Sequence, residues 1–186
     1  MQRVVILGRG GAGKSTLAAA LVQRGHPLFT DDTAAVDLSS PGKVRCVAAP
    51  ARLKLWGDAL EMVGLEGEEP VRSDASIDKH FVTPPALAPG GSTPLRRLYV
   101  LTERTGQPDG APDLEITRRV GVEAVRDLLG CVHRPRFAQE IIGREGLYAL
   151  LGRVAAGVEV HRFDRSTDPA AFRASTDRID AHLGAP

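Results

Sequence analysis

A glycine-rich segment near the N-terminus carries the residue types that bind phosphate. It reads Gly8-Arg9-Gly10-Gly11-Ala12-Gly13-Lys14-Ser15, so every fixed position of the pattern G-x-x-x-x-G-K-[ST] is filled. Glycines allow backbone angles that turn successive N–H groups towards phosphate oxygens. The lysine of this pattern reaches the β- and γ-phosphates, and the serine hydroxyl binds magnesium. The nucleotide-binding residues that we predict are Gly8, Gly10, Gly11, Ala12, Gly13, Lys14, Ser15 and Thr16.

The loop alone does not fix the reaction, because kinases, ATPases and GTPases all use it. No Asn-Lys-x-Asp segment, which reads guanine in GTPases, occurs in the second half of the chain. We therefore predict ATP and Mg²⁺ as the ligands.

Two adjacent acids, Asp31 and Asp32, follow the short apolar run His26 to Thr30. If that run is a strand, its carboxyl end faces the ligand crevice of an open α/β sheet. Neighbouring residues in a strand point to opposite faces, so both acids reach one site only if the backbone turns there. Phosphoryl transfer can use one carboxylate on the metal and one to orient the attacking hydroxyl. A solvated turn or a helix cap is the alternative interpretation of the pair.

The elements around the loop have the order that phosphate binding requires. Arg3 to Leu7 is a β-branched apolar run typical of a buried parallel strand. Lys14 to Arg24 has apolar residues at helical spacing, and Gly25 ends it as a C-terminal glycine does. The sequence thus predicts strand, phosphate loop and helix in direct succession.

The rest of the chain predicts further strands and helices in a single α/β domain, residues 1–186. The remaining predicted strands are Ala34–Leu38, Val44–Val47, Leu95–Thr102, Glu115–Val120 and Val158–Phe163. The predicted helices are Leu53–Val63, Gly121–Leu129 and Pro169–Leu183, with helical spacing interrupted by glycines in Pro135–Ala156. A proline-rich loop is expected at Thr83–Pro94 and a turn at Gln107–Pro112.

The balance of charge disfavours two classes of partner. The chain has 24 Lys+Arg against 23 Asp+Glu, so no excess charge draws it to nucleic acid or to an anionic membrane. Cys46 and Cys131 form no metal or disulfide pattern, and the first residues are not a signal peptide. We expect a cytoplasmic protein.

Several runs resemble the catalytic domain of HPr kinase/phosphorylase. They are Gly8 to Lys14 and Leu21 to Asp32, which contain the phosphate loop, the Arg-Gly-His turn and the Asp-Asp pair. Later runs are similar to blocks of small HPr-kinase-like proteins, including those encoded beside lasso peptide cyclases and other peptide natural-product enzymes. These runs are Arg52 to Glu61, Asp78 to His80 and Leu95 to Leu101.

The resemblance implies roles for the acids and for the loop. Ser15 and one acid would bind Mg²⁺, and the other acid would take the proton of an acceptor serine; we assign Asp31 to the metal and Asp32 to the base. Lys14 completes the catalytic set. Lys79 is either a phosphate or acceptor contact or an exposed lysine, and Trp56 is expected to pack on the core from a helix.

Two features of HPr kinases are not found in these residues: an N-terminal domain and a strand with a His-Gly pair ahead of the loop. The resemblance therefore leaves open the reverse phosphorylase reaction and the recognition of HPr itself. The predicted function is transfer of the γ-phosphoryl group of ATP to a hydroxyl, a serine of a small protein or peptide, by an HPr-kinase-type P-loop domain that is a candidate homo-oligomer. The alternatives are a small-molecule kinase and an ATPase that acts as a partner-regulated switch.

Overall fold

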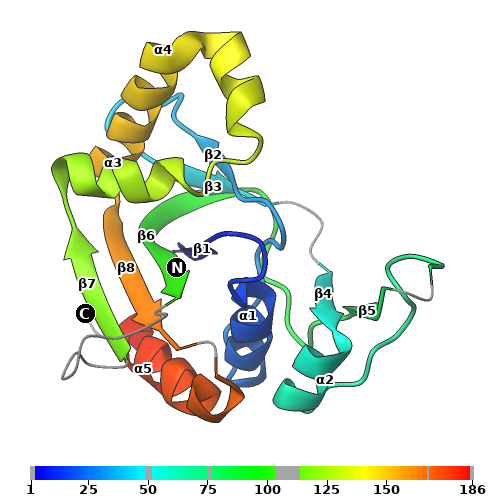
Figure 1. Ribbon diagram of the computed structural model, residues 1–186. Helices are drawn as coiled ribbons and strands as arrows, with labels where there is room; N and C mark the ends of the chain where they lie inside the picture. The colour runs from blue at the N-terminus through cyan, green and yellow to red at the C-terminus, as the bar shows by residue number, and fades with distance from the viewer. Residues whose placement is uncertain (1–2, 49–51, 75–76, 104–113, 167, 185–186) are drawn as a thin grey trace. The chain divides into compact units, whose positions relative to one another are not determined.

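A computed structural model describes residues 3–48, 52–74, 77–103, 114–166 and 168–184 of the chain, and its fold is mixed α/β (Figure 1). Two compact units can be distinguished. The first contains Met1–Ala12, Ala35–Val47 and Ser92–Thr167, and the second contains Gly13–Ala34, Ala48–Gly91 and Asp168–Pro186. The division falls inside the phosphate-loop sequence, between Ala12 and Gly13. That residues 1–186 form a single domain stays a prediction.

The first unit is built on a six-stranded sheet. Its longest strand, β6 (Ser92–Glu103), pairs in parallel with β1 (Arg3–Leu7) and with β8 (Glu159–Arg165). The antiparallel strands are β2 (Ala35–Asp37), β3 (Arg45–Val47) and β7 (Leu114–Arg119). Parallel β1, β6 and β8 bring their carboxyl ends to one edge, where the phosphate loop begins.

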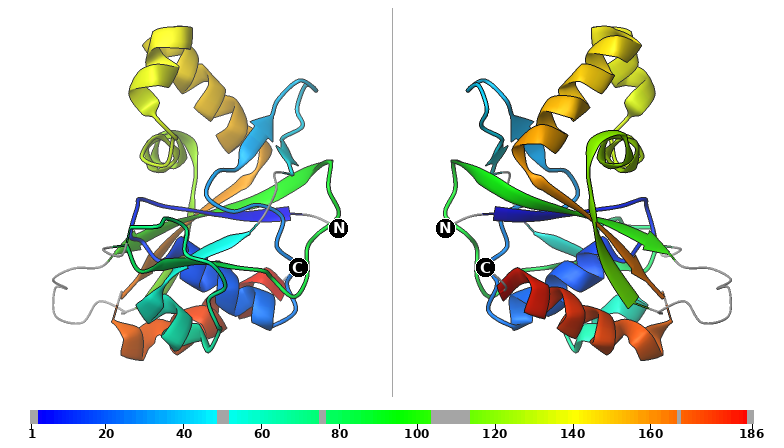
Figure 2. Two further views of the ribbon diagram at one scale, coloured as in Figure 1. Left: turned by 90° about the vertical axis from the view of Figure 1, so that its right-hand side faces the viewer. Right: turned by 90° about the vertical axis from the view of Figure 1, so that its left-hand side faces the viewer.

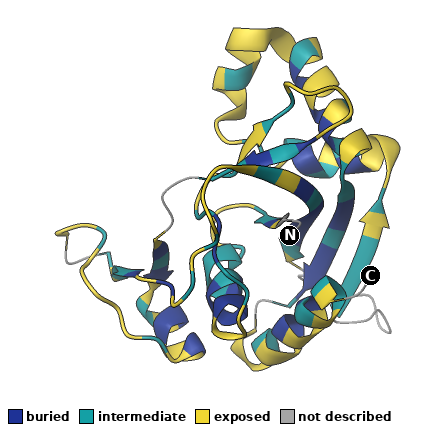
Figure 3. Ribbon diagram, turned by 180° about the vertical axis from the view of Figure 1, so that it is seen from behind, coloured by how far each residue is buried: buried dark blue, intermediate teal, exposed yellow. Residues whose placement is uncertain are grey.

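Two helices complete the first unit, α3 (Gly121–Leu129) and α4 (Pro135–Gly157). The backbone of Gly143 has φ 73° and ψ 165°, which is not a helical conformation, and α4 bends sharply there (Figure 2). The arm before the turn is exposed, whereas β8 is largely buried (Figure 3). Tyr99 and Phe163, which are fully buried, lie at the centre of this unit's core.

The second unit contains three helices and a two-stranded sheet. Its helices are α1 (Lys14–Gln23), α2 (Gly57–Val63) and α5 (Phe172–Gly184), preceded by the short 3₁₀ helix Pro169–Ala171. Strands β4 (Leu53–Trp56) and β5 (Lys79–Val82) pair antiparallel. The buried apolar cluster that joins α1, α2, β4 and β5 is Ala19, Ala20, Val22, Leu28, Leu53, Leu55, Ala59, Leu60, Val63 and Val82.

The elements next to the loop follow the sequence closely. Strand β1 has the predicted bounds, and α1 ends one residue before the predicted Arg24. Gly25 has φ 95°, and the N–H of His26 donates to the carbonyl of Leu21, which closes the helix. The other predicted strands are confirmed within three residues at each end, and α3 has its predicted bounds. The turn expected at Gln107–Pro112 lies outside the described residues.

Two predictions in the second unit are wrong. His26–Thr30 is not a strand: only Leu28 makes a bridge, to Leu87, with backbone hydrogen bonds to Ala86 and Ala88. The predicted helix Leu53–Val63 is half strand, because Leu53 and Leu55 are buried on one face of β4 while Ala59, Leu60 and Val63 follow the helical period. Strand β5 was not predicted.

Trp56 is a related correction. Predicted to pack on the core from a helix, it ends β4 in an extended conformation as the N-cap of α2 and is 50% exposed. The helix begins only at Gly57, so the indole stays outside the core.

Candidate functional site

The first half of the phosphate loop is fixed to the sheet of the first unit. A Cβ atom on Gly8 would lie 3.2 Å from the carbonyl oxygen of Leu101, so the loop leaves β1 in close contact with β6. The N–H of Ala12 donates to the carbonyl of Arg9 at 3.2 Å, and Gly11 has φ 81°, which favours glycine. Gly8, Gly10, Gly11 and Ala12 therefore form a tight turn at the carboxyl end of β1.

Arg165 holds this turn from β8. Its guanidinium Nη2 donates to the carbonyl of Ala12 at 2.7 Å, and the residue is buried, with 4% of its surface exposed. Burial lowers the pKa of Arg165 from its ordinary value. Nε of Arg165 has no hydrogen-bond partner among the described residues. Sequence reasoning missed this residue, although a charged side chain at the carboxyl end of a predicted parallel strand was a usable signal.

The second half of the loop begins α1 in the second unit. Gly13 is the N-cap with φ 73°, and its carbonyl accepts the first helical hydrogen bond, from Leu17 at 3.0 Å. Lys14, Ser15 and Thr16 occupy the first turn, where helix N–H groups are free of partners within the helix. No acid lies in this turn, so its positive dipole end is not offset by a carboxylate of the helix itself.

The structure brings Ser15 and Asp31 together. The hydroxyl of Ser15 donates to Oδ1 of Asp31 at 3.3 Å. The other oxygen of Asp31, Oδ2, is buried and has no hydrogen-bond partner among the described residues. Burial raises the pKa of Asp31, against the opposing effect of the N–H of Asp32. A buried carboxylate oxygen without a partner is costly, and a bound cation would offset that cost.

The backbone turns at the acidic pair, as a shared site requires. Asp32 has φ 59°, in the left-handed region that aspartate tolerates, and the N–H of Thr33 donates to the carbonyl of Asp31 at 2.6 Å. Thr30 closes the turn by donating its hydroxyl to the carbonyl of Thr33. Both acids therefore lie in an irregular turn. The backbone turn that a shared site requires is present, although the residues before it do not form a strand.

Asp32 differs from Asp31 in its surroundings. Its Oδ2 lies 2.5 Å from Nζ of Lys54, and its side chain is 50% exposed. That hydrogen bond is the main cause that lowers the pKa of Asp32, and the charges of Lys54, Lys79 and Lys14 act in the same direction. The two neighbouring carboxylates therefore have pKa values shifted in opposite directions, a pattern common in catalytic sites.

Lys79 and Trp56 lie on the same side of the β4–β5 sheet. Nζ of Lys79 is 5.7 Å from the centre of the Trp56 ring. Lys79 is half-buried and contributes to the field at Asp32, so it belongs to the neighbourhood of the acids. His26 does not: its Nε2 lies 2.7 Å from Oδ1 of Asp180 on α5.

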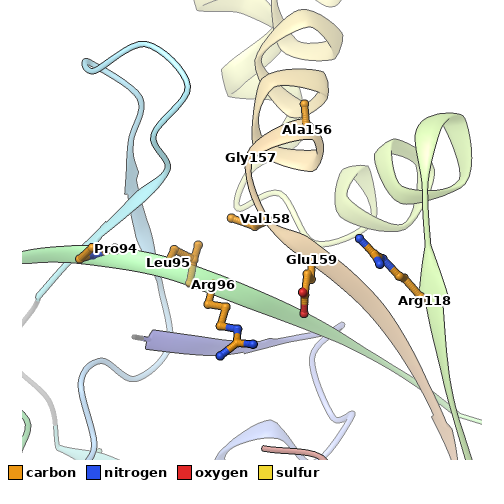
Figure 4. A pocket seen from close by; sticks show the side chains of 8 residues that line it. All are labelled: Pro94, Leu95, Arg96, Arg118, Ala156, Gly157, Val158 and Glu159. Atoms are coloured by element: carbon orange, nitrogen blue, oxygen red, sulfur yellow. The ribbon is translucent and has the colours of Figure 1, made fainter. Parts of the chain in front are cut away.

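A cavity of about 370 Å³ lies elsewhere in the first unit (Figure 4). It is lined by Pro94, Leu95, Arg96, Arg118, Ala156, Gly157, Val158 and Glu159, none of which the sequence predicts as a site residue. The guanidinium groups of Arg96 and Arg118 point in different directions in Figure 4. Positive charge is therefore not gathered at one point of this cavity.

The donor set at the acids suits magnesium better than zinc. Ser15 and Asp31 offer only oxygen, which Mg²⁺ prefers, and Mg²⁺ commonly combines one or two carboxylates with substrate phosphates and water. In the described part of the chain, no group of three or more His, Cys, Asp and Glu is placed to hold a metal ion by itself.

No helix in the described residues is long and apolar enough to cross a membrane.

Neither the protein-family models nor the curated proteins searched include a match to this chain. Among solved structures, it is similar to the HPr(Ser) kinase/phosphatase from Coxiella burnetii, at 13% sequence identity and a TM-score of 0.43. The match covers 98% of this chain and 85% of the other.

Proposed function

We propose that the protein is an ATP-dependent kinase of the HPr-kinase-like type, which transfers the γ-phosphoryl group to a serine hydroxyl of a peptide or small protein. The observation that carries this proposal is the contact between Ser15 and Asp31. The hydroxyl of Ser15, which we expect to bind the metal ion, contacts Asp31, the carboxylate that we predict as the second metal ligand. Asp32 is the next residue in the chain. The complete phosphate-loop motif supports binding of a nucleotide phosphate chain by Gly8 to Thr16.

Ser15 and Asp31 would hold Mg²⁺ through their oxygens, and the unpartnered Oδ2 of Asp31 fits that role. When bound, the ion would supply positive charge to the β- and γ-phosphates. Lys14 would contact the same phosphates, and Gly8 to Thr16 would present backbone N–H groups to them.

Asp32 is the proposed base. The acceptor hydroxyl attacks the γ-phosphorus, the bond from that phosphorus to the bridging oxygen of ADP breaks, and the hydroxyl proton passes to Asp32. The products are a phosphoserine and ADP. A carboxylate whose pKa is lowered stays ionised at neutral pH, and a loose transition state needs the nucleophile oriented more than fully deprotonated.

The partner is a hydroxyl-bearing peptide or small protein, or a small molecule in the alternative; we propose neither nucleic acid nor membrane as a partner. Assembly into a homo-oligomer is part of the proposal. An ATPase that acts as a switch would use the same residues, and it differs in releasing free phosphate without a labelled product.

The test follows the label of γ-labelled ATP. The protein is incubated with Mg²⁺ and with an extract or peptide set from its own genomic neighbourhood, and protein, peptide and small-molecule fractions are counted. We expect label in one peptide or protein, lost in Lys14→Ala and Asp32→Asn and retained in Asp37→Asn, a control carboxylate on β2. Label only in free phosphate supports the switch, and label in a metabolite supports the small-molecule kinase. Full transfer by Asp32→Asn contradicts the base assignment.

A further inference from the structure

Lys54 is in direct contact with the second acid of the pair. Its ammonium group lies 2.5 Å from Oδ2 of Asp32. Its backbone N–H also acts to lower the pKa of the neighbouring Asp31, although burial, the larger effect, raises that pKa. The contact with Asp32 was not expected from the sequence, because Lys54 was assigned to a helix.

The position of Lys54 is set by a rigid strand. Its neighbours Leu53 and Leu55 are 0% and 1% exposed, so alternation along β4 places the lysine side chain on the opposite face from the core. There it lies beside its cross-strand partner, with Nζ 6.0 Å from the centre of the Phe81 ring. A side chain that is anchored in this way reaches Asp32 at a low entropic cost.

The neighbouring cations have other partners. Arg52 is paired with Glu68 and Glu69 at 2.9 Å and 2.7 Å, and its guanidinium stacks on Phe81 at 4.3 Å. Lys79 lies over Trp56. Lys54, by contrast, forms an ion pair with the proposed base Asp32.

We propose that Lys54 is a catalytic residue, whose ammonium contacts Asp32 and the phosphoryl group in transit at the same time. This inference rests on the proposed function. An acceptor oxygen within hydrogen-bond reach of Asp32 and about 3–3.5 Å from the γ-phosphorus brings the phosphoryl oxygens next to that carboxylate. An ammonium has three N–H donors, so one can stay on Asp32 while another reaches a phosphoryl oxygen.

Such a contact strengthens as the reaction proceeds. The terminal phosphoryl group separates from both oxygens in a loose transition state, and Asp32 gains the acceptor proton and loses its negative charge. Lys54 is thereby released from its ion pair at the moment when the phosphoryl oxygens need a donor. Its contribution falls on the transition state rather than on bound ATP.

The experiment compares two ligands on four proteins. Dissociation constants are measured for Mg²⁺-ADP and for Mg²⁺-ADP with aluminium fluoride, a mimic of the phosphoryl group in transit, on wild type, Lys54→Met, Lys54→Arg and Arg52→Met. Arg52→Met is the matched control, because it removes a cation from the same Phe81 ring without touching Asp32.

We expect wild type and Arg52→Met to bind ADP more tightly with aluminium fluoride than without. Lys54→Met should bind ADP as wild type does. Its gain in affinity from aluminium fluoride should be at least about tenfold smaller than that of wild type, and Lys54→Arg should recover part of the gain. Lys54→Met that retains the full gain, or a wild type that binds ADP without any gain, overturns the inference. No ADP binding by wild type overturns the proposed function itself.

Loss of folding cannot imitate the expected result. Lys54 and Asp32 have side chains 31% and 50% exposed, so solvent screens their ion pair and its contribution to stability is small. Unchanged ADP affinity also reports an intact loop. A fall in ADP affinity equal to the fall with aluminium fluoride would show a structural role and would contradict the inference.

Discussion

At the scale of single residues, Asp31 is held at a cost to the unliganded protein. Its Oδ2 is buried without a partner in the described structure, and burial raises its pKa. The folded state therefore binds a proton at Asp31 more tightly than the unfolded state does. The ionised carboxylate destabilises the fold at neutral pH, and the penalty disappears as the pH falls through the raised pKa.

We expect Asp31→Asn to stabilise the ligand-free protein by about 1 kcal/mol at pH 7, since the charge is removed from a partly buried position. Urea denaturation without Mg²⁺ or nucleotide measures this gain. Asp32→Asn is the matched variant, and it should show no gain because it breaks the ion pair with Lys54. Equal stability of Asp31→Asn and wild type would show that the ionised carboxylate of Asp31 does not destabilise the fold.

Arg165 leads to a second prediction at this scale. Replacing it by Met removes the donor to Ala12 and should weaken ATP binding about tenfold, because a hydrogen bond from a charged group contributes about 1.5–3 kcal/mol. Titration calorimetry with a non-hydrolysable ATP analogue measures the change. Arg162→Met on the same strand is the control, since Arg162 binds Thr102 and Asp164 instead. Unchanged affinity in Arg165→Met would exclude a role in shaping the loop.

At the scale of elements, α1 and α5 are joined by one charged cluster. Arg24, just after α1, pairs with Asp177 and Asp180 on α5 at 2.5 Å and 3.0 Å, and His26 also pairs with Asp180. The contact with His26 is the main cause that lowers the pKa of Asp180. This cluster connects the helix of the phosphate loop to the C-terminal helix of the same unit.

We expect Asp180→Asn to lower the free energy of unfolding by about 1 kcal/mol at most, because the partners are partly exposed. Because the pKa of Asp180 is lowered in the folded state, its ionised carboxylate stabilises the protein at pH values above the ordinary pKa of aspartate. This stabilisation is lost as the pH falls through the pKa of the folded state. Urea titrations at pH 7 and near pH 3 should therefore show the variant converging on wild type in acid. A difference that persists unchanged in acid would point to lost packing instead of lost charge.

Local patterns predicted the elements that flank the loop and much of the candidate site. The strand at Arg3 to Leu7, the helix from Lys14 and the acids carry their signals within a few residues. Strand β5 does not, because it is defined by pairing with β4 and by backbone hydrogen bonds to residues 68–71. The contact of Lys54 with Asp32 joins residues 22 positions apart, and no spacing pattern in one sequence indicates it.

At the scale of the whole molecule, the prediction of a single domain is a prediction about how cooperatively the chain unfolds. If residues 1–186 unfold together, calorimetry shows one transition. Mg²⁺-ATP at about 100 times its dissociation constant should stabilise the native state by about 2.7 kcal/mol and raise the Tm by several degrees. Lys14→Ala should unfold in one transition without this shift. Two separate transitions in wild type would contradict the single domain.

The unpartnered oxygen of Asp31 also bears on how this protein would respond to laboratory evolution. A screen for heat resistance that is run without nucleotide rewards any substitution that removes the buried charge, so position 31 should be among the first to change. The survivors would be robust and inactive. Including Mg²⁺-ATP in the same screen would reverse the selection, because the acid then contributes to stability through the bound ion.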